Sequence, residues 1–310
     1  MMKIDIASST DPWKNVLVAI DGSQESTSIL DRARHLLARE SLAVTFLRVI
    51  ECSEGHARDP AYWTDSRHWK AREMLSTARG AFAGLSGTSN AEFRFGDPAT
   101  EILRELVDGD HDAALMNWHG GRWLGRPVAD SVANRVLLSS PVPILYFPAP
   151  AGEVGAPPNP RRFEHILVML DGSPEAEDIL PGAERMARTL GSDLHLFQAV
   201  APGRDEAARR RSADQYLSGL ARHLGSRGVV CQIQIPSGPP RDAVVRLLEE
   251  SKVDALALAT HARSGWSHVL LGSLTKELLR SARVPILTLC MKDHRRPLPV
   301  SGQRDPLRVE

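Results

Sequence analysis

The chain has 310 residues, 42% of them hydrophobic and 25% charged, and its 38 lysines and arginines balance 38 aspartates and glutamates. This length and apolar content are sufficient for two domains, each with its own core. A formal net charge of zero excludes the strongly basic surface of a protein that binds nucleic acid through its phosphates.

The first half of the chain alternates strand and helix patterns. An apolar run within residues 14–21 ends at Asp-Gly-Ser, which is typical of a strand buried on both faces of a parallel sheet. Ser23 then stands where it can cap the following helix. Later in this half, strands are predicted at 42–50, 91–95, 112–118 and 142–147, and helices at 66–85, after the Gly96-Asp97-Pro98 turn, and at 131–138.

The second half repeats this order. Residues 166–173 resemble residues 16–23, and each half closes on Val-Pro-Ile-Leu. A repeat of this length indicates a duplicated domain, and strand–helix alternation implies right-handed crossovers in a parallel sheet. We therefore predict an α/β protein of two tandem doubly wound domains, each with a five-stranded, mainly parallel sheet. The second set of strands is expected at 165–170, 193–200, 229–235, 254–259 and 285–289, with helices beginning near Pro174, Asp205, Arg241 and Ser273.

The domain limits follow from the same repeat. We place domain 1 at 13–148, a linker rich in Pro, Gly and Ala at 149–162, domain 2 at 163–291 and a flexible tail at 292–310. Asp21 and Asp171 are 150 residues apart but Pro143 and Pro285 only 142, so the first copy carries eight extra residues. We expect them in the loop at 52–69, as a variable surface loop, a lid or a contact surface.

Cysteine usage and the N-terminus bear on the compartment. Cys52, Cys231 and Cys290 show neither CxxC spacing nor a disulfide framework, as is usual in a reducing cytoplasm. Residues 1–11 contain no apolar core of a signal peptide, and no stretch of about 18 apolar residues occurs. We therefore expect a cytoplasmic chain with no membrane partner.

The loop after the fourth strand of each copy carries the most specific pattern. In the second copy, Ala259, Ala262, Gly272 and Ser273 stand at the first, fourth, fourteenth and fifteenth positions of one frame. This frame resembles the signature of the universal stress protein family, whose nucleotide-binding form reads Gly, two residues, Gly, nine residues, Gly, then Ser or Thr. The resemblance extends over both copies, including the Asp-Gly-Ser turns and the closing Val-Pro-Ile-Leu.

The resemblance implies a fold and a pairing of the two copies. The expected domain is of the universal stress protein or adenine nucleotide alpha hydrolase-like type. In single-copy relatives two subunits pair through their last strands. Here residues 142–147 and 285–289 would pair within one chain as a pseudo-dimer, since a linker of about a dozen extended residues is long enough. A further homodimer of the whole chain stays open.

The resemblance also implies a ligand, ATP or another adenine nucleotide, with Mg²⁺. The physical basis is a phosphate cradle, because glycines admit the phosphates and a helix N-terminus offers unpaired N–H groups. Asp171 would face the adenosine end and Ala199 would line the base site, while Arg263 is a phosphate partner or a solvated cation. The implied binding residues are Asp171, Ala199, Ala259, Ala262, Arg263, Gly272, Ser273 and Leu274.

Departures from the pattern distinguish the two copies. Ala259 and Ala262 replace glycines; alanine is harmless at negative φ but costs about 1 kcal/mol at positive φ. The first copy keeps Gly120 but has Asp130 where the second has Gly272. A carboxylate at that helix N-terminus caps the helix and repels a triphosphate. We expect the first copy to bind ATP poorly or not at all.

Three functions remain open on this evidence. The first is a cytoplasmic stress-response protein whose second domain binds an adenine nucleotide as a sensor or regulatory module. The second is a scaffold in which neither copy binds nucleotide and an unknown protein is the partner, as the two alanines and Asp130 would favour. The third is a slow ATP hydrolase, for which Asp171 is the one identifiable base. The sequence predicts no catalytic residues and no metal-ligand cluster.

Overall fold

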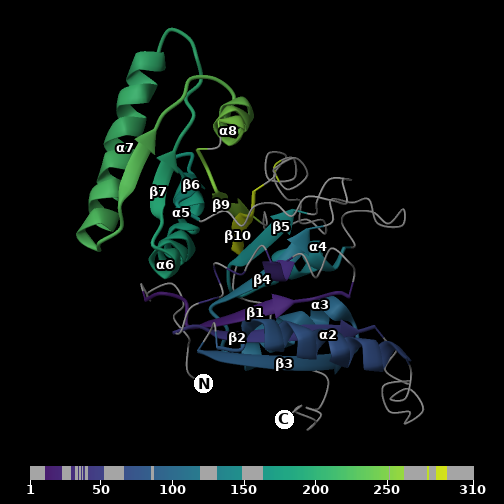
Figure 1. The fold of residues 1–310 in the computed structure, drawn as a ribbon. Helices are drawn as coiled ribbons and strands as arrows, with labels where there is room; N and C mark the ends of the chain where they lie inside the picture. The colour runs from purple at the N-terminus through teal and green to yellow at the C-terminus, as the bar shows by residue number, and fades with distance from the viewer. Residues whose placement is uncertain are drawn as a thin grey trace.

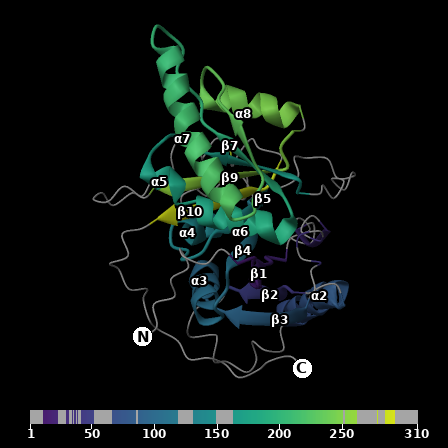
Figure 2. The same ribbon diagram turned by 90° about the vertical axis from the view of Figure 1, so that its left-hand side faces the viewer.

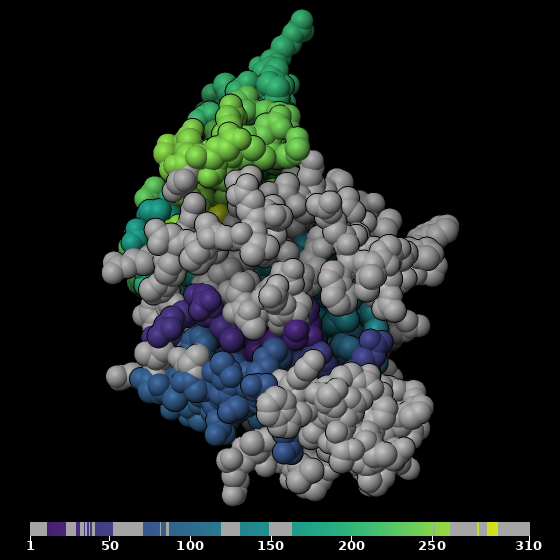
Figure 3. Space-filling view, turned by 45° about the vertical axis from the view of Figure 1, so that its right-hand side comes forward, coloured from purple at the N-terminus to yellow at the C-terminus, as the bar shows by residue number. Residues whose placement is uncertain are grey.

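The computed structural model describes residues 11–22, 29–31, 34, 36, 38, 41–51, 66–84, 87–118, 131–148, 163–250, 252–261, 278 and 284–291. Within them the two halves of the chain form one ten-stranded sheet. In the space-filling view the second copy, in green, rises above the first, in purple and blue (Figure 3). The described helices include none that is long and apolar enough to cross a membrane.

Each copy contributes five strands in the same spatial order. The order across the sheet is β3-β2-β1-β4-β5-β10-β9-β6-β7-β8, so the second copy mirrors the first. Within each copy all strand pairs are parallel, which confirms the predicted doubly wound architecture. The strands are β1 (Asn15–Ala19), β2 (Ala43–Ile50), β3 (Thr88–Phe95), β4 (Ala113–Trp118), β5 (Ile144–Pro148), β6 (His165–Met169), β7 (Asp193–Phe197), β8 (Cys231–Gln234), β9 (Ala255–His261) and β10 (Ile286–Met291).

The two copies join through their last strands. β5 and β10 pair antiparallel, with Leu145 opposite Leu287 at the centre of the pairing. Figure 1 shows these two strands side by side in the middle of the sheet. The predicted pairing within one chain is therefore confirmed for the described strands.

Helices cover both faces of the sheet (Figure 2). On one face lie α2 (Ser66–Phe82), α6 (Leu180–Leu190) and α7 (Glu206–Ser226), and on the other lie α3 (Pro98–Asp108), α4 (Val132–Leu137) and α8 (Pro240–Glu249). Each face has one apolar core that continues from the first copy into the second. Burial of apolar surface thus holds the copies together as well as each domain.

The strand patterns predict the order of the elements, and several bounds differ. β7 ends at Phe197 rather than at 200, β8 begins at Cys231 rather than at 229, and β9 extends to His261 rather than to 259. The helix expected from Pro174 is divided into α5 (Pro174–Glu177) and α6. Pro181 lies near the start of α6 and causes this break, because it has no N–H to donate to the carbonyl of Glu177, four residues earlier. Its ring would also clash with that carbonyl in a continuous helix. β3 begins at Thr88 rather than at 91, because its whole length pairs with β2.

An aspartate before the fourth strand anchors the first strand in both copies. Asp112 Oδ2 accepts the backbone N–H of Lys14 at 2.6 Å and of Asn15 at 2.9 Å. Asp254 does the same for residues 164 and 165, both at 2.9 Å. The duplicated sequence therefore reproduces side-chain contacts as well as strands.

Polar contacts also cross the junction between the copies. The Arg185 guanidinium on α6 pairs with Asp112 and donates to the carbonyl of Asp11 at 3.0 Å. The backbone N–H of Trp13 donates to Thr189 Oγ1 at 2.8 Å. These bonds fix α6 of the second copy against the residues that precede β1 and β4 in the first copy.

Candidate functional site

The candidate site of the second copy lies where the strand order reverses. The chain passes from β6 to β7 on one side, whereas β9 pairs with β6 on the other side. Extending these registers places Ala199 level with Asp171, and Ala259 level with the residue just before it. Ligands of doubly wound sheets bind at such a point, beyond the carboxyl ends of the strands. Three of the sequence-predicted residues therefore lie at the same end of the sheet, although Ala199 packs against the core on one face and Ala259 against the core on the other.

The Asp-Gly-Ser turn after β6 holds the Asp171 carboxylate in place. Asp171 Oδ1 accepts the Ser173 backbone N–H at 2.9 Å and its hydroxyl at 2.6 Å. Ser173 Oγ in turn caps α5 by accepting the N–H of Ala176 at 3.2 Å. Gly172 has φ of +86°, a conformation that glycine adopts without strain. The exposed carboxylate is thus oriented by the turn.

Ala259 stands in an extended strand. It pairs with Leu289 in the register of β9 with β10. Among the described residues, Asp110 is the sole non-glycine residue with positive φ. The alanine at this position of the family frame therefore imposes no backbone strain, and its methyl group packs against the apolar core on the face covered by α6 and α7.

The remaining predicted residues, Ala262, Arg263, Gly272, Ser273 and Leu274, lie outside the described residues. The same holds for Gly120 and Asp130 in the first copy, and for the extra loop except its helical end in α2. The phosphate cradle stays a prediction from sequence.

Gln198, which follows β7, is a neighbour of the site that the motif did not indicate. An ideal Cβ on Gly172 would lie 3.4 Å from its Nε2. Its Oε1 is buried and accepts no hydrogen bond from the described part of the chain. An acceptor left without a donor at a switch point is a candidate ligand contact. Alignment of the two halves places Arg48 at the position of Gln198, and this difference in charge is the feature of the sequence that could have indicated Gln198.

Tyr216 on α7 also lies close to this turn. Burial of the phenol raises the pKa of Tyr216, and a hydrogen bond with Glu177 and the charges of Glu177 and Asp171 raise it further. The hydroxyl therefore stays protonated at neutral pH and donates to Glu177, close to Asp171.

The first copy differs at the same point. The Arg48 guanidinium packs on Gly22, whose ideal Cβ would lie 3.2 Å from Nη2. Burial lowers the pKa of Arg48, and the charge of Asp21 opposes this shift. The first copy therefore places a cation where the second places a neutral amide.

Comparison with known proteins identifies the fold. The sequence profile of the universal stress protein family matches residues 12–148 and 162–289, one match for each copy. The chain belongs to the universal stress protein family. A universal stress protein of Mycobacterium bovis is 24% identical over 298 residues, covering 88% of this chain and 95% of the relative.

A solved structure agrees on the architecture of this universal stress protein. A universal stress protein from Archaeoglobus fulgidus superimposes with a TM-score of 0.67 at 22% identity, covering 89% of this chain and 98% of that chain. A universal stress protein solved in complex with cAMP is 19% identical with a TM-score of 0.36, covering 44% of this chain and 97% of that chain. The expected fold of two universal stress domains is confirmed.

The turn before the third helix distinguishes the two universal stress domains further. In the first, Asp97 caps α3, and Arg135 on α4 donates to both its oxygens at 2.7 and 2.8 Å. These hydrogen bonds lower the pKa of Asp97 to about 2. In the second, Pro239 takes this place and no side chain caps α8.

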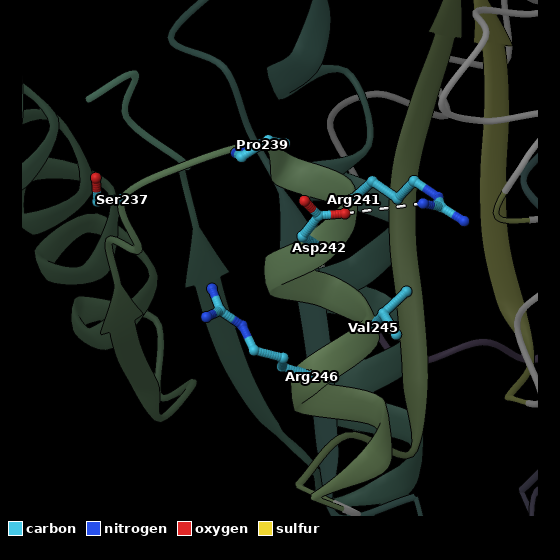
Figure 4. Close-up of a pocket in the computed structure, with 6 residues that line it drawn as sticks. All are labelled: Ser237, Pro239, Arg241, Asp242, Val245 and Arg246. Atoms are coloured by element: carbon cyan, nitrogen blue, oxygen red, sulfur yellow. Dashed lines mark ion pairs between the residues drawn. The ribbon is translucent and has the colours of Figure 1, made fainter. Parts of the chain in front are cut away.

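A hollow of about 370 Å³ opens at the uncapped end of α8 (Figure 4). Arg241 and Arg246 extend from opposite sides of the helix, and Arg241 lies 3.8 Å from the Asp242 carboxylate. None of the predicted nucleotide contacts lines it. We therefore distinguish this hollow from the candidate site.

A histidine pair lies outside the candidate site, with His165 at the first residue of β6 and His195 in the middle of β7. The rings of His165 on β6 and His195 on β7 are 4.9 Å apart between centroids. His195 is 5% exposed, and burial together with the His165 charge lowers its pKa. The described residues form no group of three or more ligands suited to a metal ion.

Proposed function

We propose that this universal stress protein binds an adenine nucleotide, ATP with Mg²⁺ or a close relative, in its second domain. It acts in the cytoplasm as a stress-response sensor or regulatory module rather than as a rapid catalyst. The domain limits 13–148 and 163–291 and the linker between them belong to the same proposal.

The convergence of Asp171, Ala199 and Ala259 at the switch point carries this proposal. The carboxylate of Asp171 accepts hydrogen bonds from an adenosine, and Ala199 leaves room for the base beside it. The extended backbone at Ala259 supports the proposal because the departure from glycine brings no strain. The phosphates would extend toward Gly272 and Ser273, at the predicted start of the next helix.

Calorimetric titration with Mg-ATP tests the proposal. The wild-type chain should bind one equivalent. Gly272→Asp, which copies Asp130 of the first domain, should abolish that binding by repelling the phosphates. Gly219→Asp is the matched control, because Gly219 lies in α7 and an added Cβ meets nothing within 4 Å. No heat with the wild type and no co-purified nucleotide would refute the proposal.

The scaffold function is the alternative that such a negative result would favour. Arg48 beside Asp21 in the first domain is the observation that supports it for one half of the molecule. A slow ATP hydrolase is the third candidate. It requires that the wild type turn over ATP and that Asp171→Asn abolish this turnover.

A further inference from the structure

The residue at the carboxyl end of the second strand differs in charge between the domains. Arg48 and Gln198 are separated by the same 150 residues as Asp21 and Asp171. Both side chains are half-buried and both lie on the glycine of the adjoining Asp-Gly turn. The two halves therefore present different chemistry at one structural position.

In the first domain the guanidinium lies flat on the turn. Nη2, Cζ and Nε of Arg48 would lie 3.2, 3.3 and 3.4 Å from an ideal Cβ on Gly22. Asp21 is near enough to stabilise the charge of this partly desolvated cation. A ligand that takes the Asp21 carboxylate as its own partner would leave the partly buried guanidinium of Arg48 without its counter-charge. Such an uncompensated buried charge raises the free energy of the complex.

In the second domain the amide of Gln198 lies in the same place without a charge. Its Nε2 lies 3.4 Å from the ideal Cβ of Gly172, and its Oε1 accepts no hydrogen bond from the described residues. A guanidinium only donates hydrogen bonds, whereas an amide oxygen accepts them. Asp171 and Gln198 thus form a pair of acceptors, which suits the amino and hydroxyl donors of adenosine.

We propose that this position decides which domain accepts adenosine, with Gln198 admitting it to the second domain and Arg48 excluding it from the first. The inference rests on the proposed function and deepens it, because it names the residue that makes the two domains unequal. It concerns the nucleoside end of the ligand and is independent of the phosphate cradle.

Equilibrium titration with adenosine isolates this position, because adenosine has no phosphate for Asp130 or Gly272 to act on. The wild type should bind one equivalent. Gln198→Arg should weaken that site at least tenfold, and Arg48→Gln should raise the count to two. Gln232→Arg, the same change at an exposed residue of β8, is the matched control and should leave affinity unchanged.

The outcomes separate the inference from the proposed function. Unchanged adenosine affinity in Gln198→Arg, or a count that stays at one in Arg48→Gln, overturns the inference while the wild-type site upholds nucleotide binding. Stronger binding of ATP to Gln198→Arg with adenosine unaffected also overturns it, because the added cation would then act on phosphates. A wild type that binds neither adenosine nor ATP overturns both. The gain of a site in Arg48→Gln cannot arise from misfolding.

Discussion

Gly182 on α6 lies close to Pro143 of the first domain, and replacing it tests the junction. An ideal Cβ at Gly182 would lie 2.9 Å from Cγ of Pro143, across the domain boundary. Carbon atoms in contact prefer a distance of about 3.5–4.0 Å. In Gly182→Ala the distance between the new Cβ and Pro143 Cγ must therefore increase by at least ~0.6 Å. The proline ring can yield only through a change of its Cγ pucker, so otherwise α6 or the residues just before β5 must move.

Two opposing effects set the magnitude for Gly182→Ala. Alanine in a helix interior gains about 1 kcal/mol over glycine. Overpacking of a buried contact costs about 1–3 kcal/mol, so the net effect is a loss of about 0–2 kcal/mol. Gly219→Ala in α7 is the matched control, since nothing lies within 4 Å of its added Cβ, and it should gain about 0.5–1 kcal/mol.

Urea unfolding followed by circular dichroism measures both variants, with equal slopes confirming that the same surface unfolds. The difference between Gly182→Ala and Gly219→Ala should be about 1–3 kcal/mol. Equal stabilisation of the two variants would refute the reasoning, because the contact of α6 with Pro143 would then not constrain the junction.

Two further predictions concern charged groups. Arg185→Met should lower the free energy of unfolding by about 2–3 kcal/mol, because the side chains of the ion pair that it removes are only 6% (Arg185) and 21% (Asp112) exposed. Arg135→Met removes a pair whose side chains are 46% (Arg135) and 44% (Asp97) exposed, so it should lower the free energy of unfolding by only about 0–1 kcal/mol. Equal losses in the two variants would contradict the argument from burial. Burial keeps the pKa of His195 below the unfolded value of 6.5, so the unfolded state takes up the proton at a higher pH than the folded state. The free energy of unfolding should therefore fall as the pH drops below 6.5, with a slope of at most ~1.4 kcal/mol per pH unit. His195→Gln should flatten this slope when unfolding is measured against pH, and an unchanged slope would show that other groups cause it.

The sequence by itself determined the duplicated architecture and predicted the strand end at which the candidate site lies. Alternating apolar strands and amphipathic helices are local patterns, so the doubly wound fold followed from periodicity alone. Asp171 could be placed at the carboxyl end of its strand because the apolar run stops there. The break between α5 and α6 differs from the single helix that the sequence predicts from Pro174, and its physical cause is Pro181.

The tertiary structure alone decided how residues distant in the sequence meet. The antiparallel register of β5 with β10 and the contact of Arg185 with Asp112 join segments from different domains, and neither has a local pattern. The same is true of Arg48 and Gln198, which have unremarkable places in their strands until the turn after the neighbouring strand packs on them. Periodicity specifies which face a side chain occupies, but the neighbour that it meets depends on strand order and packing, which are properties of the whole fold.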